Sequence, residues 1–131
     1  MTRTILLMLA FGLATHAATK PFIGRWDFDV PTPNGIGANW LGISGTEDNL
    51  EIWFQPTGGN VDRVKNYKLN GSHLTLNVSP KMVWELDAVN GQLTGTQKAG
   101  GKTIDLKGVR APELKARPVS SWTKPEALFD G

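Results

Sequence analysis

Residues 24–30 constrain the fold of this chain more than any other stretch, because charged and large apolar side chains alternate there. In an extended strand, Trp26, Phe28 and Val30 fall on one face, and the charged residues between them fall on the other. Since an unpaired charge is costly to bury, one face must contact a core and the other must face water. The stretch therefore predicts a half-buried antiparallel strand.

The same two-residue period returns along the chain in short segments separated by turn-forming residues. Asn70-Gly71 and Asn90-Gly91 stand between alternating segments, where such pairs form two-residue hairpin turns. We predict strands at residues 24–30, 38–44, 50–54, 61–69, 73–78, 82–89, 92–98 and 102–110. No stretch between residues 22 and 110 keeps the 3.6-residue period of a helix. The predicted fold is all-β, with about eight strands, as a small antiparallel up-and-down barrel or a closely related β-sandwich.

The inward-facing positions of these strands form the predicted core. It consists of Trp26, Phe28, Leu76, Trp84, Leu86, Ile104 and Leu106. Residues 31–37 contain two prolines and an Asn-Gly pair, and we expect a loop there. An eight-stranded barrel is either filled by its side chains or holds one small ligand, so the core composition bears on function.

Residues 1–17 have the features of a secretory signal peptide. A short basic start containing Arg3 precedes an apolar run at residues 5–14, and Thr15 and Ala17 supply small residues before a cleavage site. The run is shorter than the roughly 20 residues that span a bilayer as a helix. We expect export to the periplasm or the extracellular space and no membrane span after cleavage. The alternative is an N-terminal membrane anchor.

The composition changes after residue 110, where prolines recur among Lys, Arg and Ser. We therefore divide the chain into a signal peptide at 1–17, a β-barrel domain at 18–110 and a Pro-rich linker at 111–127. Residues 128–131, with the sequence LFDG, are interpreted as the truncated start of a following domain.

Charge and residue content exclude several classes of function. The formal net charge is +2 and the charges are interspersed, which argues against nucleic-acid binding. The chain has no Cys, and His73 is the single His after the expected cleavage, so a Cys- or His-rich metal site is excluded. We predict no metal and no cofactor.

Two arrangements resemble catalytic fragments. Asp27 and Asp29 lie about 6.8 Å apart on one strand face, a separation that suits an inverting glycosidase pair. We interpret the pair instead as part of a solvated outer face flanked by Arg25, because Glu85 and Asp87 repeat its spacing. His73 follows a Ser, but the sequence reveals no carboxylate to orient it, and we interpret it as a surface residue. No catalytic residue is predicted.

The tryptophans are the most informative candidates for binding. Leu50, Ile52 and Phe54 take the inward face of their strand, so Trp53 points outward. An outward indole is a platform for stacking a sugar or a contact for another domain. We select Trp53 and Trp40 as candidate ligand-binding residues.

A first family resemblance concerns the barrel itself. Gly24-Arg25-Trp26 resembles the Gly-any-Trp start of lipocalin-like barrels. The resemblance implies that Trp26 closes the barrel floor beneath an Arg from the last strand, for which Arg110 is the candidate. Gly24, Trp26 and Arg110 would then form the structural signature of the fold.

A second resemblance concerns function. The segments GRWD at 24–27, ANWLG at 38–42, GVRAP at 108–112 and LFDG at 128–131 resemble secreted bacterial proteins of the 3-keto-disaccharide hydrolase family. The resemblance implies a non-catalytic accessory barrel, with carbohydrate as a possible ligand. Its partner would be a concanavalin-like hydrolase domain after residue 131, which would hold the catalytic residues. The alternatives are a free-standing lipocalin-like carrier of a small apolar ligand and a purely structural docking domain.

Overall fold

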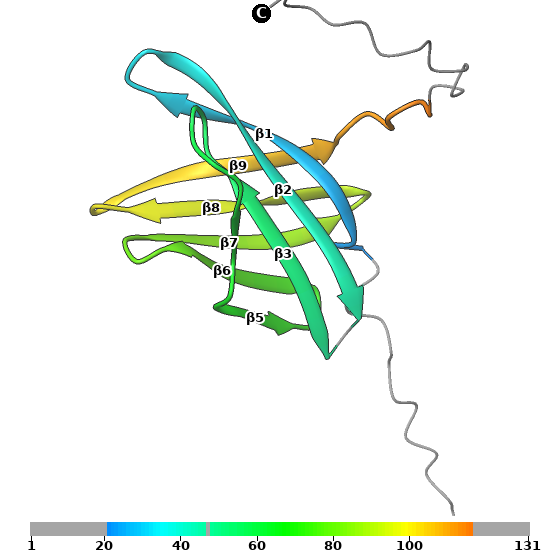
Figure 1. The fold of residues 1–131 in the computed structure, drawn as a ribbon. Coiled ribbons are helices and arrows are strands. Elements are labelled where there is room, and N and C mark those ends of the chain that lie inside the picture. The colour runs from blue at the N-terminus through cyan, green and yellow to red at the C-terminus, as the bar shows by residue number, and fades with distance from the viewer. Residues whose placement is uncertain (1–20, 47, 117–131) are drawn as a thin grey trace, which may run out of the picture.

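The computed structural model describes residues 21–46 and 48–116, which contain nine strands and no helix (Figure 1). The all-β antiparallel prediction is confirmed. The strands are β1 (Gly24–Thr32), β2 (Gly35–Thr46), β3 (Asn49–Gln55), β4 (Asp62–Arg63), β5 (Tyr67–Asn70), β6 (His73–Ser79), β7 (Met82–Val89), β8 (Gln92–Ala99) and β9 (Lys102–Arg110).

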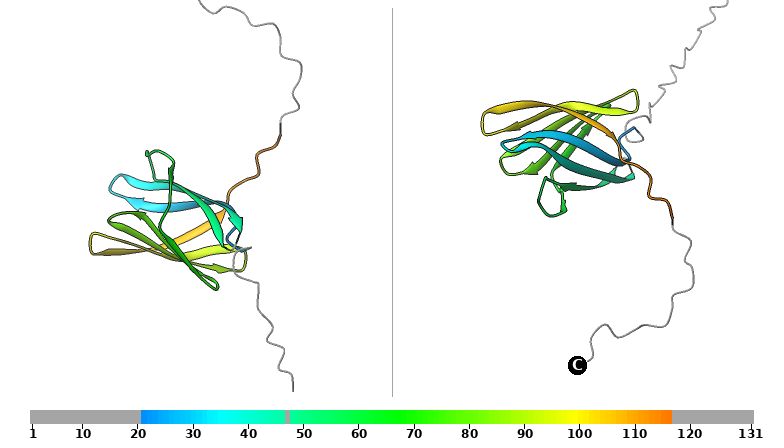
Figure 2. Two further views of the ribbon diagram at one scale, coloured as in Figure 1. Left: turned by 60° about the horizontal axis from the view of Figure 1, so that its bottom comes forward. Right: turned by 90° about the horizontal axis from the view of Figure 1, so that it is seen from above.

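All nine strands belong to one up-and-down sheet with the order β4-β3-β2-β1-β9-β8-β7-β6-β5. Strands adjacent in the chain pair with each other, except across the link from β4 to β5, and β1 also pairs with β9. The sheet curls into a half-barrel with two wings, β1–β4 and β5–β9 (Figure 2). The wings join through the hydrogen bonds of β1 and β9.

The prediction of one strand over residues 61–69 is wrong, because this stretch forms two separate strands, β4 and β5. The segment between them crosses from one wing to the other on the open side of the barrel. Its Val64 is buried and donates its backbone N–H to the Ile52 carbonyl at 2.8 Å. On the other wing, the Asn66 carbonyl accepts a hydrogen bond from Asn77 at 2.9 Å. A chain that must cross between wings cannot follow one ladder, which explains the division.

One of the two Asn-Gly turns is placed as predicted, and the other is displaced by one residue. Asn90 and Gly91 connect Val89 to Gln92, and both have positive φ, at 50° and 75°. This is the geometry of a type I′ turn. In the other hairpin the turn residues are Gly71 and Ser72, because Asn70 still pairs with His73. There only Gly71 has a positive φ, as a type II′ turn requires at its first central position.

The prediction of a loop at residues 31–37 is also wrong, since β1 and β2 extend into this stretch and form a hairpin. Thr32 pairs with Gly35, which leaves a turn of only two residues, Pro33 and Asn34. Pro31 is tolerated within β1 because β9 pairs with β1 only from Trp26 to Phe28, so the β1 edge is free beyond that point.

The core lies between the two wings. Six of the seven predicted core residues are buried, and Ile104 is only partly buried. Ile104 lies in the part of β9 that has lost its β1 neighbour, which explains its exposure. Trp84 from β7 contacts Phe28 and Phe54 edge to face, with ring centroids at 4.9 and 5.0 Å. These contacts join strands of both wings through side chains alone.

The barrel floor is built around Trp26, which is completely buried. Its indole Nε1 donates a hydrogen bond to the carbonyl of Phe22 at 2.8 Å. The Arg110 guanidinium lies over the indole, 4.0 Å from the ring centroid, and donates to the carbonyl of Ile23. The predicted contact between Arg110 and Trp26 is therefore confirmed.

Gly24 belongs to the same arrangement. Its φ is +134°, and a Cβ atom at this position would collide with the Arg110 guanidinium. Only glycine lets the chain enter β1 while Arg110 lies beside it. The need for a glycine at position 24, two residues before Trp26, thus has a steric reason.

The segment after β9 starts against β1. Ala111 donates its backbone N–H to the Arg25 carbonyl at 2.9 Å, and an Arg25 Nη donates to the Pro112 carbonyl at 3.2 Å. Residues 111–116 have no regular secondary structure. The predicted signal peptide at 1–17, the rest of the predicted linker and the segment 128–131 lie outside the described residues.

We predict that Arg110→Gln lowers the free energy of unfolding by about 2 kcal/mol, since it removes a cation–π contact and charged hydrogen bonds. Urea denaturation monitored by circular dichroism measures this. The matched control is Lys102→Gln at the other end of β9, where a surface change should alter stability by less than about 0.5 kcal/mol. A loss no larger than that of the control would show that Arg110 does not hold the floor.

Candidate functional site

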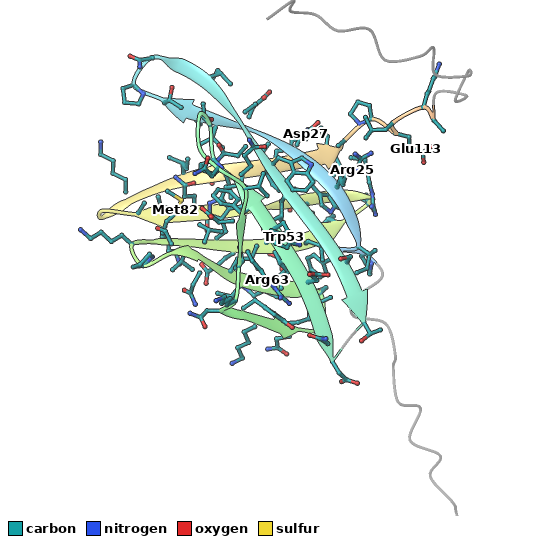
Figure 3. All side chains as sticks on the ribbon, viewed as in Figure 1. Arg25, Asp27, Trp53, Arg63, Met82 and Glu113 are labelled. Carbon is teal, nitrogen blue, oxygen red and sulfur yellow. The ribbon has the colours of Figure 1, made fainter. Side chains whose placement is uncertain are left out.

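The outer face of the first wing carries a row of side chains that crosses four strands. The backbone register pairs Arg25 with Gly42, Gly42 with Trp53, and Trp53 with Arg63. Directly opposed residues of an antiparallel sheet project to the same face. We call these four residues, together with Trp40, the outer row; Figure 3 labels its members Arg25, Trp53 and Arg63.

Trp40 completes the outer row by covering Gly42. Its neighbours Asn39 and Leu41 are buried, so the half-buried Trp40 side chain lies on the outer face. A Cβ atom on Gly42 would lie only 2.5 Å from Cη2 of the Trp40 ring. The indole therefore rests on the glycine, between the strands that carry Arg25 and Trp53. The order across the sheet is Arg25, the Trp40 ring, Trp53 and Arg63.

Trp53 is the more open of the two indoles, with 38% of its surface exposed. This agrees with the outward orientation predicted from the alternation in its strand. Trp40 in turn pairs with Asp27 on one side and Gln55 on the other, so polar side chains flank the indoles in the adjacent row. The face combines flat apolar surface with hydrogen-bonding groups.

The two arginines of the outer row form no salt bridge with any residue that the structure describes. Arg25 donates one hydrogen bond to the Pro112 carbonyl. Asp27, its nearest carboxylate along β1, lines a cleft on the β9 side instead. The guanidinium groups therefore keep hydrogen-bonding capacity for a ligand.

Sequence reasoning selected Trp53 and Trp40 but missed Arg25, Arg63 and Gly42 as their neighbours. The alternation assigned Arg25 to an outer face, but it could not say which residues of other strands lie beside it. The hairpin registers contain that information, and a turn of known length between Thr32 and Gly35 would have located Gly42 opposite Arg25.

Asp27 and Asp29, the carboxylates on the outer face of β1, lie where β1 and β9 separate. Asp27 and Asp29 border an open cleft of about 430 Å³ together with Asp105 and Lys107. Across residues 21–46 and 48–116, no group of three or more His, Asp or Glu side chains is placed to hold a metal ion. Asp29 is exposed, which fits the solvated interpretation of this pair.

His73 differs from its sequence interpretation in one respect. Its Nδ1 lies 2.8 Å from Oδ1 of Asp87 on the neighbouring strand, so a carboxylate does orient the ring. Both side chains are substantially exposed, at 39% and 49%. Within the described part of the chain, no hydroxyl group hydrogen-bonds to His73. The pair thus lacks the nucleophile that a catalytic triad needs.

A second exposed pair lies beside it on the outer face of the second wing. Lys98 Nζ approaches Glu85 Oε2 at 2.6 Å. The hydrogen bond and the positive charge of Lys98 lower the pKa of the Glu85 carboxyl below its ordinary value.

No known protein-family model matches this chain, and no curated protein sequence matches it. The resemblances to lipocalin-like barrels and to 3-keto-disaccharide hydrolases therefore stay predictions. Among the described residues there is no helix with the length and apolar character needed to cross a membrane.

We predict that Gly42→Ala displaces the Trp40 indole, because the new methyl group would occupy the position of the ring edge. The indole N–H resonance of Trp40 should shift by NMR, while the free energy of unfolding changes by less than about 1 kcal/mol. Val89→Ala is the control for spectral specificity, because Val89 is exposed at the end of β7 and lies far from β2 in the sheet. An unchanged Trp40 resonance in the Gly42 variant would contradict the contact.

We also predict a small acid-dependent loss of stability from Glu85. Its pKa is lower in the folded chain, so its contribution is complete above the unfolded value of about 4.3 and is lost as the pH falls through the folded value. Lys98→Gln should raise the pKa of Glu85 toward its ordinary value, measured by NMR titration of the carboxyl carbon. Lys102→Gln should not affect that pKa. If Lys98→Gln leaves the pKa of Glu85 unchanged, Lys98 is not the cause of its lowered pKa.

Proposed function

We propose that residues 18–110 form a non-catalytic accessory module of an exported glycoside-processing hydrolase, and that the outer row binds carbohydrate. The observation that carries this proposal is the exposed Trp53 beside Trp40 on a rigid sheet. The exposed faces of indoles suit the C–H faces of sugar rings, and Gln55 and the arginines supply polar partners for hydroxyl groups.

The packed interior supports a binding site outside the barrel. Trp26, Trp84 and Phe28 are at most 1% exposed and occupy the space between the wings. A barrel that carries a small apolar ligand needs an interior cavity, usually of 300–1,000 Å³. Clefts of about 300 to 430 Å³ do occur, but they open at the surface, and the one of about 430 Å³ between β1 and β9 is lined by carboxylates. These features weigh against the carrier alternative.

A docking role for the same face has one observation in its favour. The segment after β9 is held against Arg25 through Ala111 and Pro112, so the chain leaves the barrel next to the outer row. A following domain would thus be tethered through a segment that leaves the barrel beside Arg25. Under this alternative the indoles would be covered by protein rather than by sugar.

Two parts of the proposal, export and the hydrolase partner, are supported by the sequence alone. The pattern of residues 1–17 supports export, and the motifs at 24–27, 38–42, 108–112 and 128–131 support kinship with 3-keto-disaccharide hydrolases. In this proposal catalysis belongs to the following domain, and the barrel retains the glycan near it.

We predict that the full chain binds neutral oligosaccharides and that Trp53→Ala weakens the affinity at least tenfold. Isothermal titration against gluco-, manno-, galacto- and xylo-oligosaccharides measures this, and the Trp53 indole N–H should shift on binding. Val89→Ala is the matched control, because Val89 is an exposed apolar residue of the second wing and should not affect binding. The proposal fails if no oligosaccharide, neutral or acidic, binds, or if Trp53→Ala binds as tightly as the unmodified chain.

A further inference from the structure

We infer that the outer row selects acidic carbohydrates, namely glycans that carry uronate groups. This inference rests on the proposed function and adds a charge requirement to it. Trp40 and Trp53 supply the stacking surface, and the backbone register places Arg25 and Arg63 at the two ends of the same row. The row crosses three interstrand spacings, or roughly 14 Å, so one ligand chain can contact both arginines.

The arginines are suited to carboxylates because each guanidinium presents several donors in one plane. A carboxylate can accept two parallel hydrogen bonds from that plane, an arrangement that Lys and neutral side chains do not offer. Neither Arg25 nor Arg63 has a carboxylate partner within the described residues. Their charges are therefore not already neutralised by an ion pair.

Carboxylates near the outer row limit the region in which the two arginines can attract an acidic ligand. Asp27 belongs to the adjacent row and lines the cleft toward β9 with Asp29 and Asp105. Glu51 lies on the outer face of β3, two residues from Trp53 and next to the β2–β3 turn. A third carboxylate, that of Glu113, follows Pro112, the hydrogen-bond partner of Arg25. The register places the two arginines in one row with the indoles, and it places Asp27 and Glu51 in the rows to either side. An acidic sugar chain bound along the row between the arginines avoids Asp27 and Glu51, whereas one bound across the row does not.

The test compares acidic oligosaccharides with the methyl esters of the same sugars, which carry no charge. Oligogalacturonate and oligomannuronate are titrated into the full chain beside their fully methyl-esterified forms, which keep the sugar backbone and lose the negative charge. We expect the acids to bind at least tenfold more tightly than the esters at low ionic strength. The preference should shrink as salt is added, because salt screens exposed charges.

Variants separate the arginines from the indoles. Arg25→Gln and Arg63→Gln should each reduce the ratio of acid to ester affinity several-fold, and the double variant should bring it near one. Trp53→Ala should weaken binding of acid and ester alike. Lys102→Gln, at the β8–β9 turn of the second wing, removes one positive charge away from the row and should leave the ratio unchanged.

The outcomes distinguish this inference from the proposed function. Equal affinity for acid and ester, or a preference that survives the double arginine variant, overturns the acidic selectivity and leaves carbohydrate binding standing. If neither uronate binds while a neutral oligosaccharide does, the selectivity is again wrong. If no carbohydrate of either kind binds, the proposed function falls with it.

Discussion

The stacking of Arg110 on Trp26 is the contact on which the rest of this structure depends. It joins the first strand to the last, and the same guanidinium holds the carbonyl of Ile23. Burying the large indole removes apolar surface from water, and the exposed Arg110 guanidinium is attracted to the face of the ring. Gly24 is required at the entry to β1 because a side chain there would displace Arg110. One cluster thus joins the first strand to the last and fixes the start of β1.

The pairing of β1 with β9 is short, extending only from Trp26 to Phe28 of β1. Beyond Phe28 the ladder between β1 and β9 ends, so the strands diverge and leave a carboxylate-lined cleft. The wings are held together farther inside by Trp84 packed against Phe28 and Phe54. On the opposite edge, the hydroxyl of Tyr67 accepts a hydrogen bond from the Leu50 backbone at 2.9 Å and ties β5 to β3. The first wing is therefore supported from several sides.

This construction favours a binding site on the outside of the barrel, as we propose. Aromatic rings fill the interior, and the proposed ligand surface is the outer row, where the Trp40 indole lies on Gly42 beside Trp53. The backbone positions of these residues are set by the β1–β2–β3 ladders rather than by loops. A sheet-mounted platform of this kind loses little conformational freedom when a ligand binds.

The sequence by itself determined the fold class, most of the core and the outward position of Trp53, because alternation and turn residues are local properties of an extended chain. It did not determine the division of residues 61–69, the exposure of Ile104 or the pairing of His73 with Asp87. Nor could it show that Arg25 and Arg63 share one row with the tryptophans. These features depend on the register between strands and on where two strands diverge. Register follows from the packing of the whole sheet, and only the tertiary structure decides it.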